Sequence, residues 1–245
     1  MSDLQESGEF AEESATTVEE TRTDAGHGTQ PSRERPLWHS PLFGLDPRRT
    51  VGAVAILLAF VALFVASHLA TTVSVGGRPL ETTSPAFDTL SAIVILFATV
   101  LMVVGPILYA VWNGGPIVAV TLASVPVVLA EIVAGRYVLG LDAAIALTTA
   151  VAGCVLASYV VDVDRTGSLR PWSQVDCSLE RLLAVTVVTV VGAVSVWRFV
   201  AVAPSALQSA YLPFGVLWLV PAVLTSRYWL ARVGPSTRPS ASASS

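Results

Sequence analysis

The chain alternates long apolar runs with short polar joints over most of its length. Six of these runs each approach the ~20 residues that a helix needs to cross a bilayer. They cover about residues 51–75, 89–112, 116–135, 141–161, 181–203 and 209–231. Backbone polar groups in hydrocarbon must be bonded within their own segment, so runs of this length favour helices. The pattern predicts an all-α, polytopic integral membrane protein with six transmembrane helices.

The segments that flank this transmembrane domain, residues 51–231, differ from it in composition. Residues 1–35 are acidic and rich in Ser, Thr and Gly, so they cannot bury enough apolar surface to offset chain entropy. Residues 36–50 mix aromatic residues with prolines and arginines, which is typical of a segment at the lipid headgroups. Residues 232–245 are Ser-rich. We predict a disordered amino-terminal tail, a membrane-interface segment and a disordered carboxy-terminal tail.

The arginines near the ends of the six runs predict the orientation in the membrane. Cytoplasmic loops carry an excess of Lys and Arg. If the amino terminus is cytoplasmic, ten of these arginines lie inside, and only Arg78, Arg136 and Arg198 lie outside. The distribution predicts a multi-pass protein of the cell membrane with both termini in the cytoplasm.

Composition removes several classes of function. The 245 residues are 53% hydrophobic and only 13% charged, and the net charge is −4. No Lys occurs, which excludes Schiff-base chemistry and a Walker-type phosphate loop. The basic footprint of a nucleic-acid-binding protein is missing. A Lys-free chain with an acidic tail leads to the hypothesis of a halophilic source.

One carboxylate interrupts the third apolar run. On a helix, Thr121, Ser124, Val128, Glu131 and Gly135 fall at steps of three and four and share one stripe. If the helix begins at Pro116, Glu131 lies about 22 Å along it. An ionisable group at this depth of a membrane is a functional candidate, and a partner for it is expected.

Other ionisable residues fall near the same predicted depth, on the outer side. Our hypothesis is that Arg198 pairs with Glu131 or Asp142, with His68 nearby, in an outward-facing pocket for a proton, an ion or a small solute. Arg136 flanks the same side. In the alternative, each side chain lies near a helix end, and Arg136 and Arg198 extend to the outer headgroups.

The fourth run carries a stripe of small residues. Small faces of this kind let helix backbones approach closely in membranes. The stripe consists of Asp142, Ala146, Thr149, Ala150, Gly153 and Ala157. It predicts that this helix packs tightly against a neighbour and that Asp142 points into the bundle.

The chain continues after the fourth run with YVVDVDRTGSL, in which Asp162, Asp164, Thr166 and Gly167 form a DxDxTG pattern. Over these six residues it resembles the first motif of haloacid-dehalogenase-type phosphatases, which implies a nucleophilic aspartate, a second aspartate as acid or base, and magnesium. The preceding run is long enough to cross a membrane, however, and the next begins about 19 residues later. The sequence therefore favours a solvated loop here.

Two classes of function stay open. The first is a non-enzymatic permease, or a membrane subunit or scaffold of a larger assembly, with the lipid bilayer and other membrane proteins as partners. The alternative is an integral-membrane enzyme acting on a phosphorylated lipid or nucleotide, with a divalent cation held by Asp162 and Asp164 and with Asp176 and Glu180 as further candidate ligands. No cofactor is expected apart from magnesium in that alternative.

Overall fold

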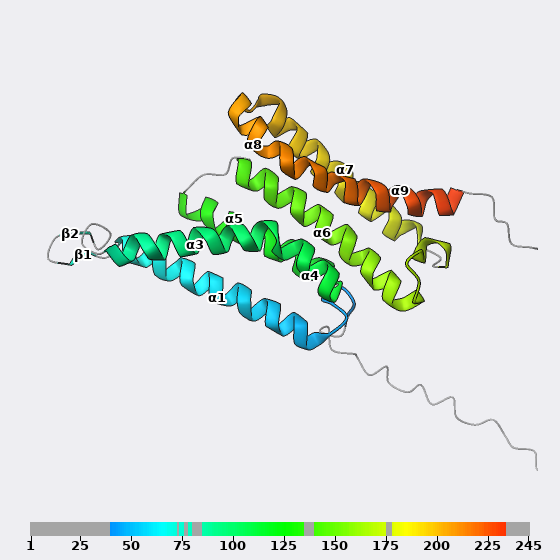
Figure 1. Cartoon of the computed structure of the whole chain (residues 1–245), viewed down its shortest axis with the longest axis horizontal. Coiled ribbons are helices and arrows are strands. Elements are labelled where there is room, and N and C mark those ends of the chain that lie inside the picture. Colours follow the sequence, from blue (N-terminus) through cyan, green and yellow to red (C-terminus); the bar gives the residue numbers. More distant parts are fainter. Residues whose placement is uncertain are drawn as a thin grey trace, which may run out of the picture. The chain divides into compact units, whose positions relative to one another are not determined.

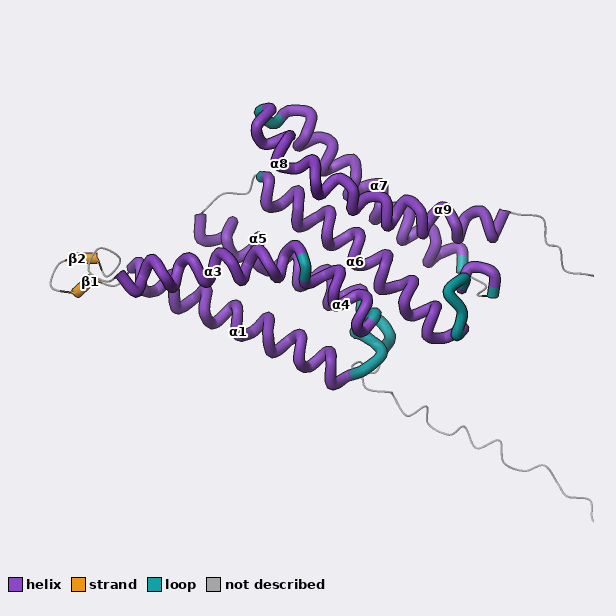
Figure 2. The backbone as a smooth tube through the Cα atoms, in the orientation of Figure 1, coloured by secondary structure: helices purple, strands orange, loops and turns teal. Residues whose placement is uncertain are grey.

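The computed structural model describes residues 40–72, 74–75, 78–79, 85–134, 140–174 and 178–233. Nearly all of them are helical (Figure 1, Figure 2). The elements are α1 (Pro47–Thr72), β1 (Ser74–Val75), β2 (Arg78–Pro79), α3 (Pro85–Val103), α4 (Gly105–Asn113), α5 (Pro116–Ala134), α6 (Leu141–Thr166), η2 (Pro171–Ser173), α7 (Leu179–Val202), α8 (Ser205–Gly215), η3 (Val216–Trp218) and α9 (Leu219–Val233). The strands form a two-residue antiparallel pair.

The helices have the length and apolar character of membrane spans. Within the part of the chain that the structure describes, five stretches are long and apolar enough to cross a bilayer, and the number rises to six if the bent pair of α3 and α4 forms one span. That pair bends by 49°. The predicted fold class is confirmed: the protein is an all-α, polytopic membrane protein.

The first span begins earlier than the apolar pattern predicts. α1 starts at Pro47, four residues before the predicted start. Proline suits the first helical position, and the Asp46 carboxylate accepts a bond from the Arg48 amide at 2.9 Å. The cap and the proline, rather than hydrophobicity, set where α1 begins.

The helix α6 is the centre of the bundle. It packs against α3, α4 and α5 and also against α7, α8 and α9 (Figure 1). In its most apolar window 67% of the residues are buried, compared with 11% in α7. Because α6 is enclosed by other helices, its polar side chains need partners within the protein.

The predicted face of small residues on α6 is buried. Ala146, Ala150 and Ala157 are each no more than 5% exposed. A Cβ atom at Gly153 would lie 2.9 Å from the Cβ of Pro106, closer than real Cβ atoms come, and 3.1 Å from its carbonyl oxygen. Glycine at this position therefore lets α4 approach α6 closely.

The bend between α3 and α4 has a local cause. Pro106 has no amide hydrogen, so it leaves the carbonyl of Met102 without its usual partner in the helix. The hydroxyl of Thr149 on α6 donates a hydrogen bond to that carbonyl at 2.7 Å. A side chain of the central helix thus satisfies the group that the kink releases, as a membrane interior requires.

The reversal between α4 and α5 follows from its glycines. Gly114 adopts a left-handed φ of 66° and closes α4. A Cβ atom on Gly115 would lie 2.3 Å from the carbonyl oxygen of Phe43, so only glycine fits there. The reversal thereby packs directly against the segment that precedes α1.

Asn113 joins that preceding segment to the bundle. It is fully buried, and its side-chain oxygen accepts from the Asp46 amide at 2.8 Å. Its side-chain nitrogen donates to Tyr109 Oη at 2.8 Å and to Thr50 Oγ1 at 2.9 Å. The Tyr109 hydroxyl in turn donates to the carbonyl of Phe43 at 2.6 Å. These bonds hold the approach to α1 against the end of α4.

Candidate functional site

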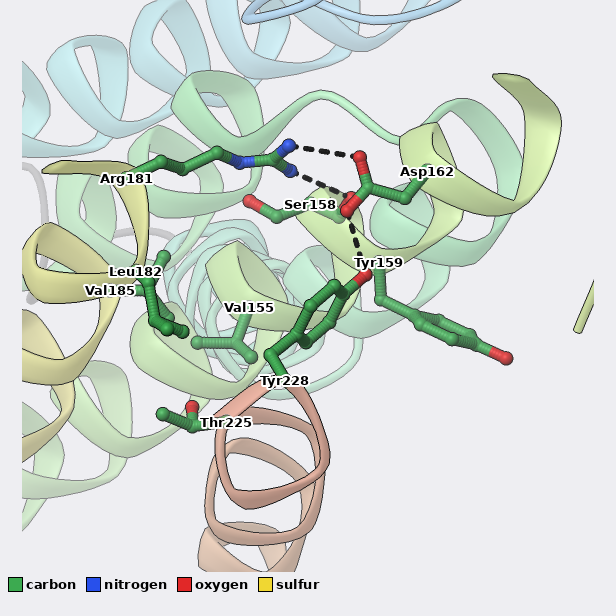
Figure 3. Close-up of a pocket in the computed structure, with 9 residues that line it drawn as sticks. All are labelled: Val155, Ser158, Tyr159, Asp162, Arg181, Leu182, Val185, Thr225 and Tyr228. Atoms are coloured by element: carbon green, nitrogen blue, oxygen red, sulfur yellow. Dashed lines mark hydrogen bonds and ion pairs between the residues drawn. The ribbon is translucent and has the colours of Figure 1, made fainter. Parts of the chain in front are cut away.

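A buried ion pair joins three helices at one end of the bundle. Asp162 of α6 is 1% exposed, and its Oδ1 accepts from Nη1 of Arg181 on α7 at 2.9 Å. Its Oδ2 accepts from the Tyr228 hydroxyl on α9 at 2.7 Å. Arg181 Nη2 also donates to the carbonyl of Ser158 at 3.1 Å. Figure 3 shows the side chains of Arg181 and Tyr228 directed at the Asp162 carboxylate.

Local structure explains how Asp162 and Arg181 come to face each other. α6 continues to Thr166 and closes at Gly167, which has a left-handed φ of 63°. α7 is capped by Ser178, whose side chain accepts from the Arg181 amide. The ion pair therefore links the C-terminal end of α6 to the first turn of α7.

The expected solvated loop over the DxDxTG pattern is wrong. Asp162, Asp164 and Thr166 are helical, and the run of helix extends five residues past the predicted end at 161. α6 ends because Gly167 takes the left-handed conformation that closes a helix, and not because the sequence becomes less hydrophobic. Asp162 is consequently a buried residue of the bundle rather than an exposed residue of a loop.

Small and aromatic side chains surround the ion pair. A cavity of about 30 Å³ lies beside it and is lined by Val155, Ser158, Tyr159, Asp162, Arg181, Leu182, Val185, Thr225 and Tyr228 (Figure 3). The ring of Trp172 in η2 stacks on Tyr159 with centroids 6.2 Å apart and meets Tyr228 edge-on at 6.1 Å. The space is too small for an organic substrate, which needs several hundred Å³.

The electrostatics of the cluster favour a structural role. A buried carboxylate is costly unless it is paired and hydrogen-bonded, and both oxygens of Asp162 have such partners. The Arg181 side chain is 34% exposed, so the cation keeps contact with the surroundings while the anion does not. The arrangement clamps α6, α7 and α9 together.

The magnesium hypothesis gains no support from this geometry. Asp164 is exposed, whereas Asp162 is buried. Residues two apart on a helix point in directions about 200° apart. Among the described residues, no group of three or more His, Cys, Asp or Glu side chains could hold a metal ion. Asp176, considered as a further ligand, lies outside the described residues.

The described residues of the predicted outer polar cluster lie on four helices. Glu131 is in the last turn of α5 and Asp142 in the first turn of α6, and both are half-buried; Arg198 on α7 is exposed. His68 is exposed on α1, and Arg136 lies outside the described residues. The ion pairs between described residues join Asp46 to Arg49 and Asp162 to Arg181, so neither contains Glu131 or Arg198.

Glu131 differs from the other members of this cluster. Its Oε2 is buried and has no hydrogen-bond partner within the described part of the chain. The stripe of α5 that carries Glu131 and Val128 does not face the centre of the bundle, since the Val128 side chain is 52% exposed. Glu131 thus lies at the edge of the bundle, and its pairing with Arg198 or Asp142 stays a prediction.

The apolar pattern does not reveal the partners of Asp162. Arg181 is one of the ten arginines predicted to lie inside, and no sequence motif singles out Tyr228. One signal was available: Thr148, Val155 and Asp162 recur every seven residues and define a second buried face of α6. Gly167 also marks the helix end that keeps Asp162 on this face. The identity of its partners could not be obtained from periodicity.

Comparison with known proteins gives no match to a family model, a curated protein or a solved structure. The class of protein therefore rests on the fold: a multi-pass membrane protein built around one enclosed helix.

Proposed function

We propose that this protein is a non-enzymatic membrane subunit or scaffold. The observation that supports this most is that the buried polar side chains of α6 form hydrogen bonds to neighbouring helices. Thr148 bonds to Tyr211 of α8, Thr149 to the Met102 carbonyl of α3, and Asp162 to α7 and α9. Each of these groups joins helices together, and none of them is left over for a substrate.

The outer surface of α7 supports the same proposal. Large apolar residues recur along it at steps of three and four, and each is more than half exposed. They are Val187, Val190, Val191, Val194 and Trp197. Such a ridge of valines and a tryptophan is suited to packing against lipid or against another transmembrane helix.

The proposal includes an orientation. Arg48, Arg165, Arg170 and Arg181 belong to the same end of the bundle, where α1 and α7 begin and α6 ends. By the excess of arginine, this end faces the cytoplasm and the termini lie on that side of the cell membrane.

The surface of α7 provides a test. A photo-crosslinking amino acid at Val191, which is 59% exposed, is expected to give one discrete adduct above the 25.7 kDa chain in native membranes. The matched control is Val196 on the same helix, which is 3% exposed and should give none. Only lipid adducts at Val191, with no protein adduct, would contradict a subunit role for this surface. Mass spectrometry of the adduct identifies the partner.

A permease is the second candidate, and the buried, unpartnered Oε2 of Glu131 favours it. An intramembrane carboxylate of this kind can bind a proton or a cation during transport. The scaffold proposal predicts that liposomes containing the wild type or Glu131→Gln show the same slow proton leak, recorded with an internal pH-sensitive dye. A wild-type flux that Glu131→Gln abolishes and Gln208→Ala retains would replace the scaffold by a permease.

A further inference from the structure

A groove of about 210 Å³ lies beside Arg181, and none of the aromatic residues of the ion-pair cluster lines it. Four parts of the chain form it: the segment before α1, the start of α5, the last turns of α6 and the start of α7. We call it the Arg165 groove. It is lined by Pro41, Leu42, Pro116, Ser158, Val161, Arg165 and Arg181.

The charge of the Arg165 groove is positive. Its lining contains Arg165 and Arg181 and no acidic residue. The nearest buried acid, Asp162, is already bonded to Arg181 and Tyr228. Arg165 is exposed and takes part in no ion pair between described residues. One full positive charge therefore remains at the groove after Asp162 is compensated.

Apart from Ser158, the rest of the lining is apolar. Pro41, Leu42, Pro116 and Val161 form a wall beside the two guanidinium-bearing residues. The groove is also at the level where spans end, since α5 begins at Pro116 and α6 ends at Thr166. Trp112, which is 50% exposed at the end of α4, suits the same headgroup level. A ligand that matches this lining has an anionic head and an apolar body.

We propose that the Arg165 groove binds the phosphate of an anionic lipid headgroup, with Arg165 as the main contact. Guanidinium groups bind phosphate oxygens through paired, charge-assisted hydrogen bonds. Basic pockets between transmembrane helices on the cytoplasmic side are suited to such headgroups, because that leaflet is anionic. Leu42 and Val161 then contact the glycerol and the first acyl carbons. A free phosphate offers the same oxygens but leaves the apolar wall uncovered.

The test uses the full chain in detergent, with native mass spectrometry to count bound phosphatidylglycerol and phosphatidylcholine. The wild type is expected to retain phosphatidylglycerol preferentially. Arg165→Gln should weaken phosphatidylglycerol binding by about fivefold, the effect of roughly one arginine near an anionic headgroup. Arg48→Gln is the matched control, because it removes an exposed arginine near the same end that does not line the groove.

Two further measurements distinguish binding of the lipid from binding of free phosphate. Leu42→Ser is expected to weaken phosphatidylglycerol binding, while inorganic phosphate should compete poorly with the lipid. Inorganic phosphate that binds as tightly as phosphatidylglycerol would overturn the lipid assignment. Equal losses in Arg165→Gln and Arg48→Gln would show general surface charge and overturn the site. Because Arg165 is exposed, unchanged thermal unfolding of the lipid-free variant is expected and confirms that it is folded.

Discussion

Arg181→Met is expected to lower the free energy of unfolding by about 3–5 kcal/mol, the range for breaking a buried ion pair. The reason is that the substitution leaves Asp162 at 1% exposure without its cation. Among the described residues, Tyr228 then remains as the one side-chain donor to the carboxylate. The loss is measured by reversible unfolding in mixed micelles.

Two further variants decide whether the charge is the cause. Asp162→Asn in the Arg181→Met background should recover a large part of the loss, because a neutral amide no longer needs the cation. Arg48→Met, which removes an exposed arginine, should stay within about 1 kcal/mol of the wild type. If Arg181→Met were equally mild, the pair would not clamp the helices.

Asn113→Leu is expected to cost about 3 kcal/mol, because it leaves several buried polar groups unsatisfied. The variant removes the acceptor of the Asp46 amide and the donor to Tyr109 and Thr50. Besides the unfolding free energy, amide hydrogen exchange at Asp46 should become faster, since that amide loses its bond to the Asn113 side chain.

The control for Asn113→Leu is Gln208→Leu, which removes an exposed side-chain amide bonded to a single carbonyl. It should change the unfolding free energy by no more than about 0.5 kcal/mol. Unchanged exchange at Asp46 in Asn113→Leu would contradict the proposed attachment of the segment before α1. That segment carries Pro41 and Leu42, so its release should also weaken lipid binding in the Arg165 groove.

The arrangement of spans could be predicted from the sequence because hydrocarbon leaves a chain few options. Each predicted apolar run corresponds to one helix or to a broken pair, and the small face of α6 is buried as expected. The bounds were harder to predict, because Asp46, Gly167 and Ser178 set them through capping rather than hydrophobicity.

The candidate site was harder to predict for a different reason. Asp162 and Tyr228 are 66 positions apart, and only packing of α9 against α6 brings them together. Local periodicity carries no information on such a pair. Depth along the axis was estimated for Glu131, but the side of the helix that faces lipid depends on its neighbours.

The enclosed position of α6 has a consequence for biosynthesis. The ribosome delivers Asp162 well before its partners, Arg181 and then Tyr228, because these lie 19 and 66 residues further along. Until α7 enters the bilayer, the Asp162 carboxylate has no cation to pair with and should stay at the aqueous boundary of the membrane. The hydrogen bond from Tyr228 forms last, when α9 is inserted. Nascent chains that stop short of residue 228 should therefore be the ones that quality-control proteases recognise.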